Sequence, residues 1–324
     1  MNRVARKLVG CAAACALPSF RGAPVRQGMW PRRRGRIRLA CSAALAAVGC
    51  VPHAAALRDT PQDPSGKPVL EEKVEPFTYI VNDTEERAGT RRVLTLDLGG
   101  GVTMDLVRIR AGQFTMGSPP DEKDRDADEA AHEVTLTKDF YLGKYEVTQE
   151  QYEAVTGSNP SHFKGRLLPV ESVNLADAAA FCVALGEKVK RLVELPSEAQ
   201  WEYACRAGTT TTYHFGSKLD PEKANTDKGA SVNVGSYEAN GFGLHDMHGN
   251  VKESCQDSYG PYDELAGTTD PIQATRGPDH QRILRGGSWY LDGRECRAAD
   301  RVPCGHGPDL RAYDIGMRVC LGID

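Results

Sequence analysis

The stretch Gly241-Phe-Gly-Leu-His-Asp-Met-His-Gly-Asn-Val-Lys-Glu-Ser-Cys255 mixes small residues with side chains that carry oxygen. Asp246, Asn250 and Glu253 stand close together in it, and Gly249 lies between the first two. Closely spaced oxygen donors around a glycine are typical of loops that fold around a hard cation such as Ca²⁺. The alternative is a turn in which Asp246 and Asn250 hydrogen-bond to their own backbone, and spacing alone favours it. The rest of the chain must decide between the two.

Basic residues are concentrated at the start of the chain. Residues 1–57 contain ten Arg or Lys and no Asp or Glu, whereas the whole chain has a net charge of −4. Without them, 30 basic residues face 44 acidic ones, which gives a net charge of −14. Such an acidic chain repels phosphate groups, so nucleic acid and anionic membrane surfaces are not expected as partners.

Residues 1–56 are predicted to be a targeting segment for export. Residues 32–38 are rich in Arg, residues 39–51 are apolar, and the three alanines at 54–56 form a small-residue cleavage site. The apolar run is too short to span a bilayer. Because the full segment is long for a leader, translation is expected to begin at Met29. The mature protein is therefore expected in the periplasm or another extracytoplasmic compartment.

Cysteines mark two further features of the exported chain. Ala47-Val-Gly-Cys50 loosely resembles a lipoprotein cleavage box, with Ala instead of Leu at its first position. Lipidation at Cys50 is thus an alternative, and membrane contact is expected only in that case. Six cysteines follow the leader, and an even number in an oxidising compartment predicts disulfide bonds. The fifteen possible pairings are not resolved by their spacing.

The remaining chain divides into a linker and one domain. Residues 57–90 are polar, charged and contain four prolines, which is typical of a linker. Residues 91–324 form the domain. It is expected to begin with two strands, 93–98 and 102–109, because apolar and polar residues alternate on both sides of a three-glycine turn.

Helix signals are confined to the first half of this domain. Thr148, Asn174 and Ser197 are predicted N-caps, two of them with Gln three residues later. Beyond Ala207 periodicity fades, and only residues 283–284 and 315–321 look strand-like. The pattern predicts a single, loop-rich α+β domain with little regular secondary structure, in which cross-links or ions hold the loops.

The acidic run from Asp121 to Glu129 offers a second possible cation loop. Its alternating Asp residues are similar to the start of a calcium-binding helix-loop-helix. Glu129, however, stands where that motif needs glycine, and Thr135 where it needs the closing Glu. A solvated loop is the expected structure.

Seven segments, in order along the chain, resemble the formylglycine-generating enzyme, or sulfatase-modifying factor, domain family. They are Phe114-Thr-Met-Gly-Ser118, Tyr145-Glu-Val-Thr148 with Gln151-Tyr152, Pro169-Val170, Leu195-Pro-Ser-Glu-Ala-Gln-Trp-Glu-Tyr-Ala204, Gly243-Leu-His-Asp-Met-His-Gly-Asn-Val251, Arg285-Gly-Gly-Ser-Trp289 and Gly316-Met-Arg318. The resemblance begins near Leu94 and implies a single domain resembling the C-type lectin fold.

The resemblance also implies bound calcium, which favours the metal interpretation of the opening stretch. In the family the matching loop holds Ca²⁺ through two side chains and two carbonyls. Carried over, the ligands are the side chains of Asp246 and Glu253 and the carbonyls of Gly249 and Val251.

A second family site would use Asn225 and Thr226 together with the positions of Gly235 and Tyr237. The family enzymes have a carboxylate at the position of Gly235, which predicts a weak or empty second site here. In both sites the metal is expected to stabilise the fold rather than to take part in chemistry.

Enzymes of the family bind copper through two cysteines spaced Cys-x₄-Cys and use O₂ to convert a sulfatase cysteine into formylglycine. A Cu(I) ion needs thiolate ligands. Counting from Ser288 places Leu291 at the first cysteine position and Cys296 at the second. Counting back from Ala298, Ala299 and Arg301 instead moves Cys296 off the site, so one thiol at most remains in either register. Copper and formylglycine synthesis are therefore not expected. The alternative is an oxidase with Cys296 at its active site and Ser288 beside it.

Family analogy pairs Cys296 with Cys205 and Cys182 with Cys320, and leaves Cys255 with Cys304 by elimination. The family also has aromatic residues where this chain has Lys252, Ser254 and Ser258. These changes predict either an altered ligand cleft or a less stable member.

A binding or accessory role is expected, with an unknown protein, peptide or glycan as ligand. The candidate surface includes Ser288, Trp289 and the loop at Lys252. Three arginines would suit an anionic ligand, although surface salt bridges are the favoured alternative for them. They are Arg297, Arg301 and Arg311.

Overall fold

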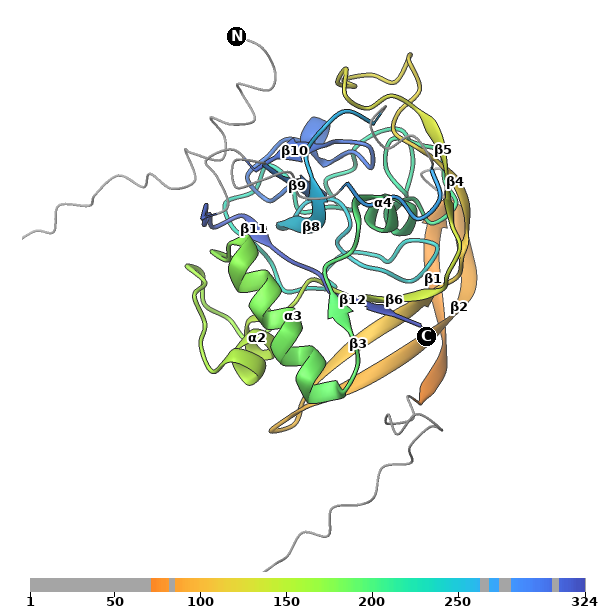
Figure 1. Cartoon of the computed structure of the whole chain (residues 1–324). Helices are drawn as coiled ribbons and strands as arrows, with labels where there is room; N and C mark the ends of the chain where they lie inside the picture. Colours follow the sequence, from red (N-terminus) through yellow and green to blue (C-terminus); the bar gives the residue numbers. More distant parts are fainter. Residues whose placement is uncertain (1–70, 82–84, 263–267, 274–280, 305–308, 324) are drawn as a thin grey trace, which may run out of the picture.

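A computed structural model describes residues 71–81, 85–262, 268–273, 281–304 and 309–323. Its largest element is a six-stranded sheet with the order β1-β2-β3-β6-β12-β7, in which every pair is antiparallel (Figure 1). Its strands are β1 (Glu72–Val81), β2 (Glu85–Gly99), β3 (Val102–Ile109), β6 (Phe140–Gly143), β7 (Val193–Glu194) and β12 (Cys320–Gly322). The predicted strand pair on either side of Gly99–Gly101 is thus confirmed as β2 and β3.

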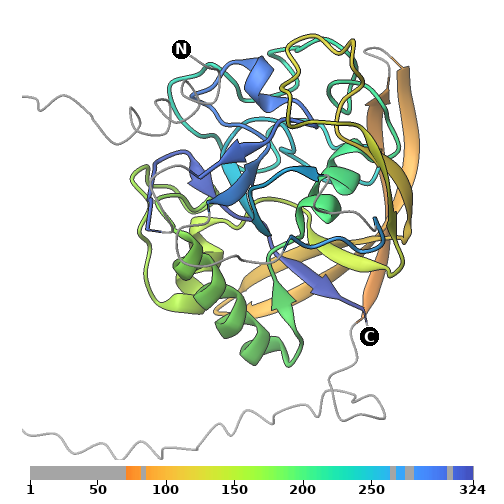
Figure 2. The ribbon, with the colours of Figure 1, turned by 45° about the horizontal axis from the view of Figure 1, so that its top comes forward.

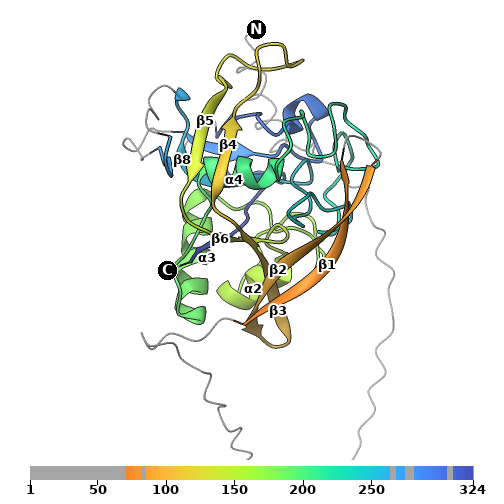
Figure 3. The same ribbon diagram turned by 90° about the vertical axis from the view of Figure 1, so that its right-hand side faces the viewer.

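Alternation along these strands creates a core on each face of the sheet. Leu94 and Leu106 belong to the cluster beneath helices α2 (Gln149–Thr156) and α3 (Leu175–Val189). Their neighbours Val93 and Val107 belong to the opposite cluster, which contains Trp201 of helix α4 (Glu198–Arg206). Successive side chains of a strand point to opposite faces, so one sheet serves both cores. In Figure 3, helices α2 and α3 lie apart from helix α4.

Capping residues set the three helix starts that the sequence predicts. Thr148, Asn174 and Ser197 each accept the N–H of the third helical residue, and that residue's side chain reaches back to the cap N–H. These reciprocal bonds satisfy backbone groups that a helix end otherwise leaves without partners. No helix in the described ranges is both long and apolar enough to cross a membrane.

Short strands and long connections make up the rest of the domain. Strands β4 (Gly112–Met116) and β5 (His132–Leu136) form a hairpin. A second sheet, of order β10-β9-β8-β11, joins β8 (Lys252–Ser258), β9 (Arg282–Arg285), β10 (Val302–Pro303) and β11 (Ile315–Gly316). Figure 2 shows this sheet surrounded by loops and set apart from the long strands β1 and β2. The prediction of a mixed, loop-rich single domain is confirmed.

The prediction of a linker over residues 57–90 is wrong for its second half. Strand β1 and the start of β2 lie in that range, and they pair from Glu72–Leu94 to Val81–Glu85. Most of their residues in this range are only partly buried or exposed, so polar and charged side chains are tolerated and mask the strand pattern. The predicted targeting segment, residues 1–56, and the linker residues up to 70 lie outside the described residues.

Candidate functional site

The loop that leads into β8 is tightly folded. Asp246, Gly249 and Asn250 all have a left-handed backbone, with φ of 58°, 87° and 56°. A Cβ atom at Gly249 would stand 2.3 Å from the carbonyl oxygen of Asn225, so only glycine fits at this position. Asn250 donates its N–H to the same carbonyl at 2.9 Å. The loop is therefore clamped against the segment around Asn225.

Two buried oxygens in this region have no hydrogen-bond partner within the described part of the chain. Asp246 accepts the N–H of Gly235 through Oδ2 at 2.6 Å, and its Oδ1 is unpaired. Asn225 donates to Ala230 O and Asn250 Oδ1, and its own Oδ1 is unpaired. A buried oxygen without a partner is costly, and hard cations bind such oxygens. Asp246 and Asn225 thus fit the ligand chemistry of Ca²⁺.

Glu253, by contrast, is already occupied by protein groups. Arg318 donates to both of its carboxylate oxygens at 2.8–3.1 Å, and Trp201 donates its indole N–H at 2.8 Å. All three side chains are buried. A bidentate pair with Arg uses both carboxylate oxygens, which a metal ion would otherwise bind. Glu253 is therefore already held by Arg318 and Trp201, and its role as a calcium ligand stays a prediction of the resemblance.

Glu146 is a third buried carboxylate at this site and was not singled out by the sequence. It accepts the N–H of Val251 at 3.1 Å and the side-chain amide of Asn250 at 2.6 Å. Burial raises its pKa well above the usual value, and the charges of Asp246 and Glu253 raise it further. Burial also raises the pKa of Asp246 to about 6. Three carboxylates thus share one buried region with a single guanidinium, that of Arg318.

The other expected ligands lie nearby with backbone roles. Asn225 and Gly249 form a parallel bridge, and Thr226 is buried beside it. The carbonyl of Tyr237 faces His245 Nδ1 at 2.9 Å. The structure therefore brings the two predicted ligand sets into one region.

The candidate binding surface at Ser288 and Lys252 is not on the surface. Lys252 Nζ lies 2.7 Å from Asp314 Oδ2, and Ser288 donates to the same oxygen at 2.9 Å. All three residues are at most 1% exposed, and Trp289 is also buried. The surface prediction is wrong because Asp314 recruits both side chains inward. Lys252 replaces an aromatic residue of the family by an internal ion pair.

Cys296 is fully buried at the end of a short 3₁₀ turn, Gly293–Cys296. Its sulfur lies near the carbonyls of Asp292 and Ser288, at 3.5 and 4.0 Å. Burial raises the pKa of the thiol far above its usual value. Leu291, at the first cysteine position of the family pair, is also buried. An enclosed thiol with a raised pKa is a poor metal ligand.

None of the expected disulfide bonds is formed. Cys182, Cys205, Cys255, Cys296 and Cys320 are all free thiols, which removes each of the three pairs. Cys205 instead lies 3.7 Å from His248 Nε2, and His248 Nδ1 lies 2.7 Å from the carbonyl of Cys296. The imidazole therefore stands between the two residues that family analogy joins.

Two of the three predicted surface arginines are internal. Arg297 binds both oxygens of Glu129 at 2.6 and 2.7 Å, and Arg301 binds both oxygens of Glu198 at 2.7 and 2.9 Å. These side chains are at most 1% exposed. Only Arg311 forms a partly exposed ion pair, with Asp177. Arg297 and Arg301 are thus part of the core and do not offer charge to an external anion.

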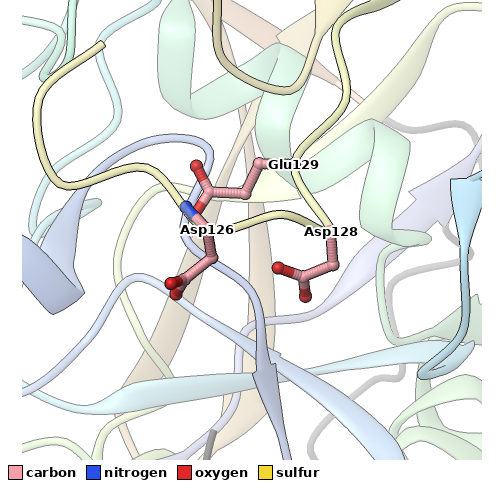
Figure 4. A group of neighbouring side chains, drawn as sticks. All are labelled: Asp126, Asp128 and Glu129. Carbon is pink, nitrogen blue, oxygen red and sulfur yellow. The ribbon is translucent and has the colours of Figure 1, made fainter. Parts of the chain in front are cut away.

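The acidic loop from Asp121 to Glu129 is less exposed to solvent than the sequence predicts. One oxygen each from Asp126, Asp128 and Glu129 lies within 4.8 Å of the others (Figure 4). Glu129, however, is buried against Arg297, and Asp128 accepts the hydroxyl of Tyr259 at 2.7 Å. These bonds fasten the loop to the domain, and they account for the closeness of the three carboxylates.

Comparison with known proteins places this geometry in a family. Residues 101–323 match the model of the sulfatase-modifying factor enzyme 1-like domain. The chain belongs to this family. The formylglycine-generating enzyme of Mus musculus is 27% identical over 285 residues, which cover 66% of this chain and 74% of that protein. A serine/threonine-protein kinase, pkn1, of Chlamydia caviae is 31% identical over 248 residues, 68% of this chain but only 38% of the kinase. The chain therefore spans little more than a third of the kinase.

Two solved structures and one further relative complete the comparison. PvdO from Pseudomonas aeruginosa has a TM-score of 0.64 and 27% identity, and Treponema denticola variable protein 1 has 0.63 and 26%. Each alignment covers 71% of this chain and 98% of the other. A chaperone protein, LppX, of Paenibacillus barcinonensis is 30% identical over 210 residues, 48% of this chain and 71% of LppX. The sulfatase-modifying fold thus occurs in relatives with several different names.

Proposed function

We propose that this protein is an exported, non-catalytic binding or accessory member of the sulfatase-modifying family, stabilised by calcium. The observation that carries the proposal is the full burial of Cys296, which raises the pKa of its thiol; counting from Ser288, Leu291 stands at the family's first cysteine position. Export rests on the leader pattern of residues 1–56. The C-type lectin-like description of the fold rests on the family resemblance.

The residues present do not fit a copper centre. Linear Cu(I) coordination needs two accessible thiolates, and Cys296 offers one buried thiol. Cys205 is also fully buried, and its sulfur lies 3.7 Å from His248 Nε2, so it does not supply a second accessible thiolate. No oxidation step through copper is therefore derived for this chain.

Calcium fits the loop, with a ligand set different from the one expected from the family. The unpaired oxygen of Asp246 would hold the ion of this loop with the carbonyls of Gly249 and Val251, and the unpaired oxygen of Asn225 would serve the second site. Glu253 would remain bound to Arg318 and keep the loop in place. The ion would offset negative charge that Glu146 and Asp246 otherwise concentrate in the interior. Its contribution would be to stability.

The accessory role is supported by the naming of one relative as a chaperone. The alternative is an oxidase that acts through Cys296 and another ligand in an unfamiliar arrangement. A direct assay separates the two: the mature protein is incubated with Cu(I), O₂ and a Cys-x-Pro-x-Arg peptide, and formylglycine is measured by mass spectrometry. We expect no product. Formylglycine made by the wild type and lost in Cys296→Ser would establish the oxidase.

A further inference from the structure

A groove of about 450 Å³ lies between helix α3 and the second sheet, and Cys182 is part of its lining. It is bounded by helix α3, by the segment 192–195 and by strands β8 and β9. Its lining is mostly apolar, and Leu175, Ala179, Cys182 and Val183 all come from one face of α3. The volume lies in the range of ligand-binding sites. Nothing in the copper or calcium chemistry of the family requires this groove.

Exposed apolar side chains gather at the groove. Val183 is 62% exposed, Leu192 72% and Ile272 54%. They are three of the six large hydrophobic residues that are exposed in the described ranges, and all three line this groove. Isolated exposed apolar residues are ordinary, whereas a group around a cavity marks a binding surface. The groove therefore favours a partner with apolar side chains.

Two polar groups of the groove favour different parts of a ligand: Arg282 suits an anion, and Gln273 suits a hydrogen-bond donor. Arg282 is half-buried in its wall and donates to the carbonyl of Gln256. Within the described ranges no ion pair joins a carboxylate to its guanidinium within 4.0 Å, and the charge of buried Asp257 acts on it from farther away. Gln273, also in the lining, is buried, and its unpaired Oε1 is an acceptor that suits an N–H donor such as a peptide backbone. Glu194, the one carboxylate of the lining, is exposed to solvent. A half-buried guanidinium without a carboxylate would pair with one supplied by a ligand.

The groove also runs beside the edge of the large sheet. β7 is its last strand and pairs with β12 alone among the described strands. Val193 and Glu194, which form β7, line the groove together with Leu192 and Leu195. An exposed sheet edge is a template for an added strand, whose alternate side chains enter neighbouring pockets.

We propose that this groove binds an extended peptide segment of a partner protein, with apolar side chains against α3 and a carboxylate against Arg282. This inference rests on the proposed binding role and names the class of partner for it. The apolar rim would contact the side chains of such a segment. Arg282 would contact its carboxylate, and the edge of β7 would contact its backbone. A fatty acid would use the first two features and leave the strand edge unused.

Fluorescence anisotropy with a labelled peptide tests the proposal. The probe is fluorescein-Thr-Val-Thr-Leu-Thr-Asp with a free carboxyl end, and the neutral probe has Asn-amide in place of the final Asp. The double variant Val183→Ser/Leu192→Ser removes the rim, and Leu167→Ser changes a side chain that is 49% exposed elsewhere. Arg282→Gln removes the cation, and Arg282→Lys retains it.

We expect saturable binding of the acidic probe, weakened at least tenfold in the double variant and unchanged in Leu167→Ser. Arg282→Gln should weaken the acidic probe about tenfold and leave the neutral probe unchanged, and Arg282→Lys should restore part of the loss. The proposal is overturned if the acidic probe does not bind, if Leu167→Ser weakens binding as much as the double variant, or if decanoate binds while the peptide does not.

The same preparations are assayed for formylglycine. If the protein neither binds the peptide nor makes formylglycine, the groove proposal is overturned and the non-catalytic function stands. Product formed by a protein that also binds the peptide would overturn the non-catalytic function and leave the groove in place.

Discussion

Lys252 Nζ and Asp314 Oδ2 lie 2.7 Å apart, and both side chains are at most 1% exposed. The pair connects the start of β8 to the loop before β11, where Lys252 also donates its N–H to the carbonyl of Asp314. It shows how this chain accommodates a charged residue at a position where the family has an aromatic one.

Removing one partner of this pair should destabilise the protein strongly. Lys252→Met leaves Asp314 as an uncompensated buried charge, so the free energy of unfolding should fall by about 3–5 kcal/mol. The double variant Lys252→Met/Asp314→Leu should recover much of that loss. Urea denaturation measures both. The control is Arg311→Ala, which breaks a partly exposed pair and should cost about 0.5 kcal/mol or less. Equal losses in Lys252→Met and Arg311→Ala would contradict the internal role of Lys252.

Calcium should raise the melting temperature of the wild type through Asp246. At a free calcium concentration of 100 times Kd, linkage contributes about 2.7 kcal/mol. Asp246→Ala should lose this response, whereas Glu253→Gln should be less stable without calcium but still respond to it, because Arg318 and Trp201 occupy that carboxylate. Differential scanning calorimetry with calcium or chelator makes the comparison. A response lost in Glu253→Gln and kept in Asp246→Ala would reverse the ligand assignment.

Gly249 should be far less tolerant of substitution than Gly100. Both have positive φ, but a Cβ at Gly249 would meet the carbonyl of Asn225 at 2.3 Å, whereas nothing lies within 4 Å of one at Gly100. Gly100→Ala should cost about 1 kcal/mol for backbone strain alone. Gly249→Ala should cost several times more, because the loop must move. Equal urea midpoints for Gly100→Ala and Gly249→Ala would show that the close contact between Gly249 and Asn225 is not needed for stability.

Asp257 should make stability fall as the pH rises. It is buried beside Glu198, and burial raises its pKa to about 7, above the unfolded value near 3.8. Between these values the folded state holds a proton that the unfolded state releases. Stability from this group is therefore present below about pH 4 and is lost up to about pH 7, by about 1.4 kcal/mol per pH unit. In Asp257→Asn the free energy of unfolding should depend less steeply on pH. An unchanged slope in urea titrations across this pH range would exclude Asp257 as its source.

The sequence was most informative where structure depends on near neighbours. Thr148, Asn174 and Ser197 act as caps because their partners lie three residues away. Strands 93–98 and 102–109 follow from alternation around a short turn. β1 escaped prediction because its half-exposed faces do not show a clear apolar period.

The candidate site was less predictable because its partners come from distant segments. Arg318 and Glu253 are 65 residues apart, and Arg297 and Glu129 are 168 apart. Spacing gives no information about such pairs, so the sequence does not reveal that Arg318 holds Glu253 or that Arg297 is internal. Glu146 lay in a recognised motif, Tyr145-Glu-Val-Thr148, and its position there was the one available signal.

Cys296 should be alkylated only after unfolding. Its thiol is fully buried and protonated, so iodoacetamide should not react with the native protein, while denaturation without reductant should expose a free thiol. Peptide mass spectrometry identifies the modified residue. A Cys205–Cys296 disulfide found under these conditions would contradict the free thiols of the structure.

Copper binding by the folded protein tests the central claim most directly. The mature protein is titrated with Cu(I) in competition with a chromogenic chelator, with Cys296→Ser as the matched variant. Because Cys296 is an enclosed, single thiol, this position should retain no Cu(I), and the two proteins should give the same titration curve. One equivalent of Cu(I) held by the wild type and released in Cys296→Ser would contradict the account.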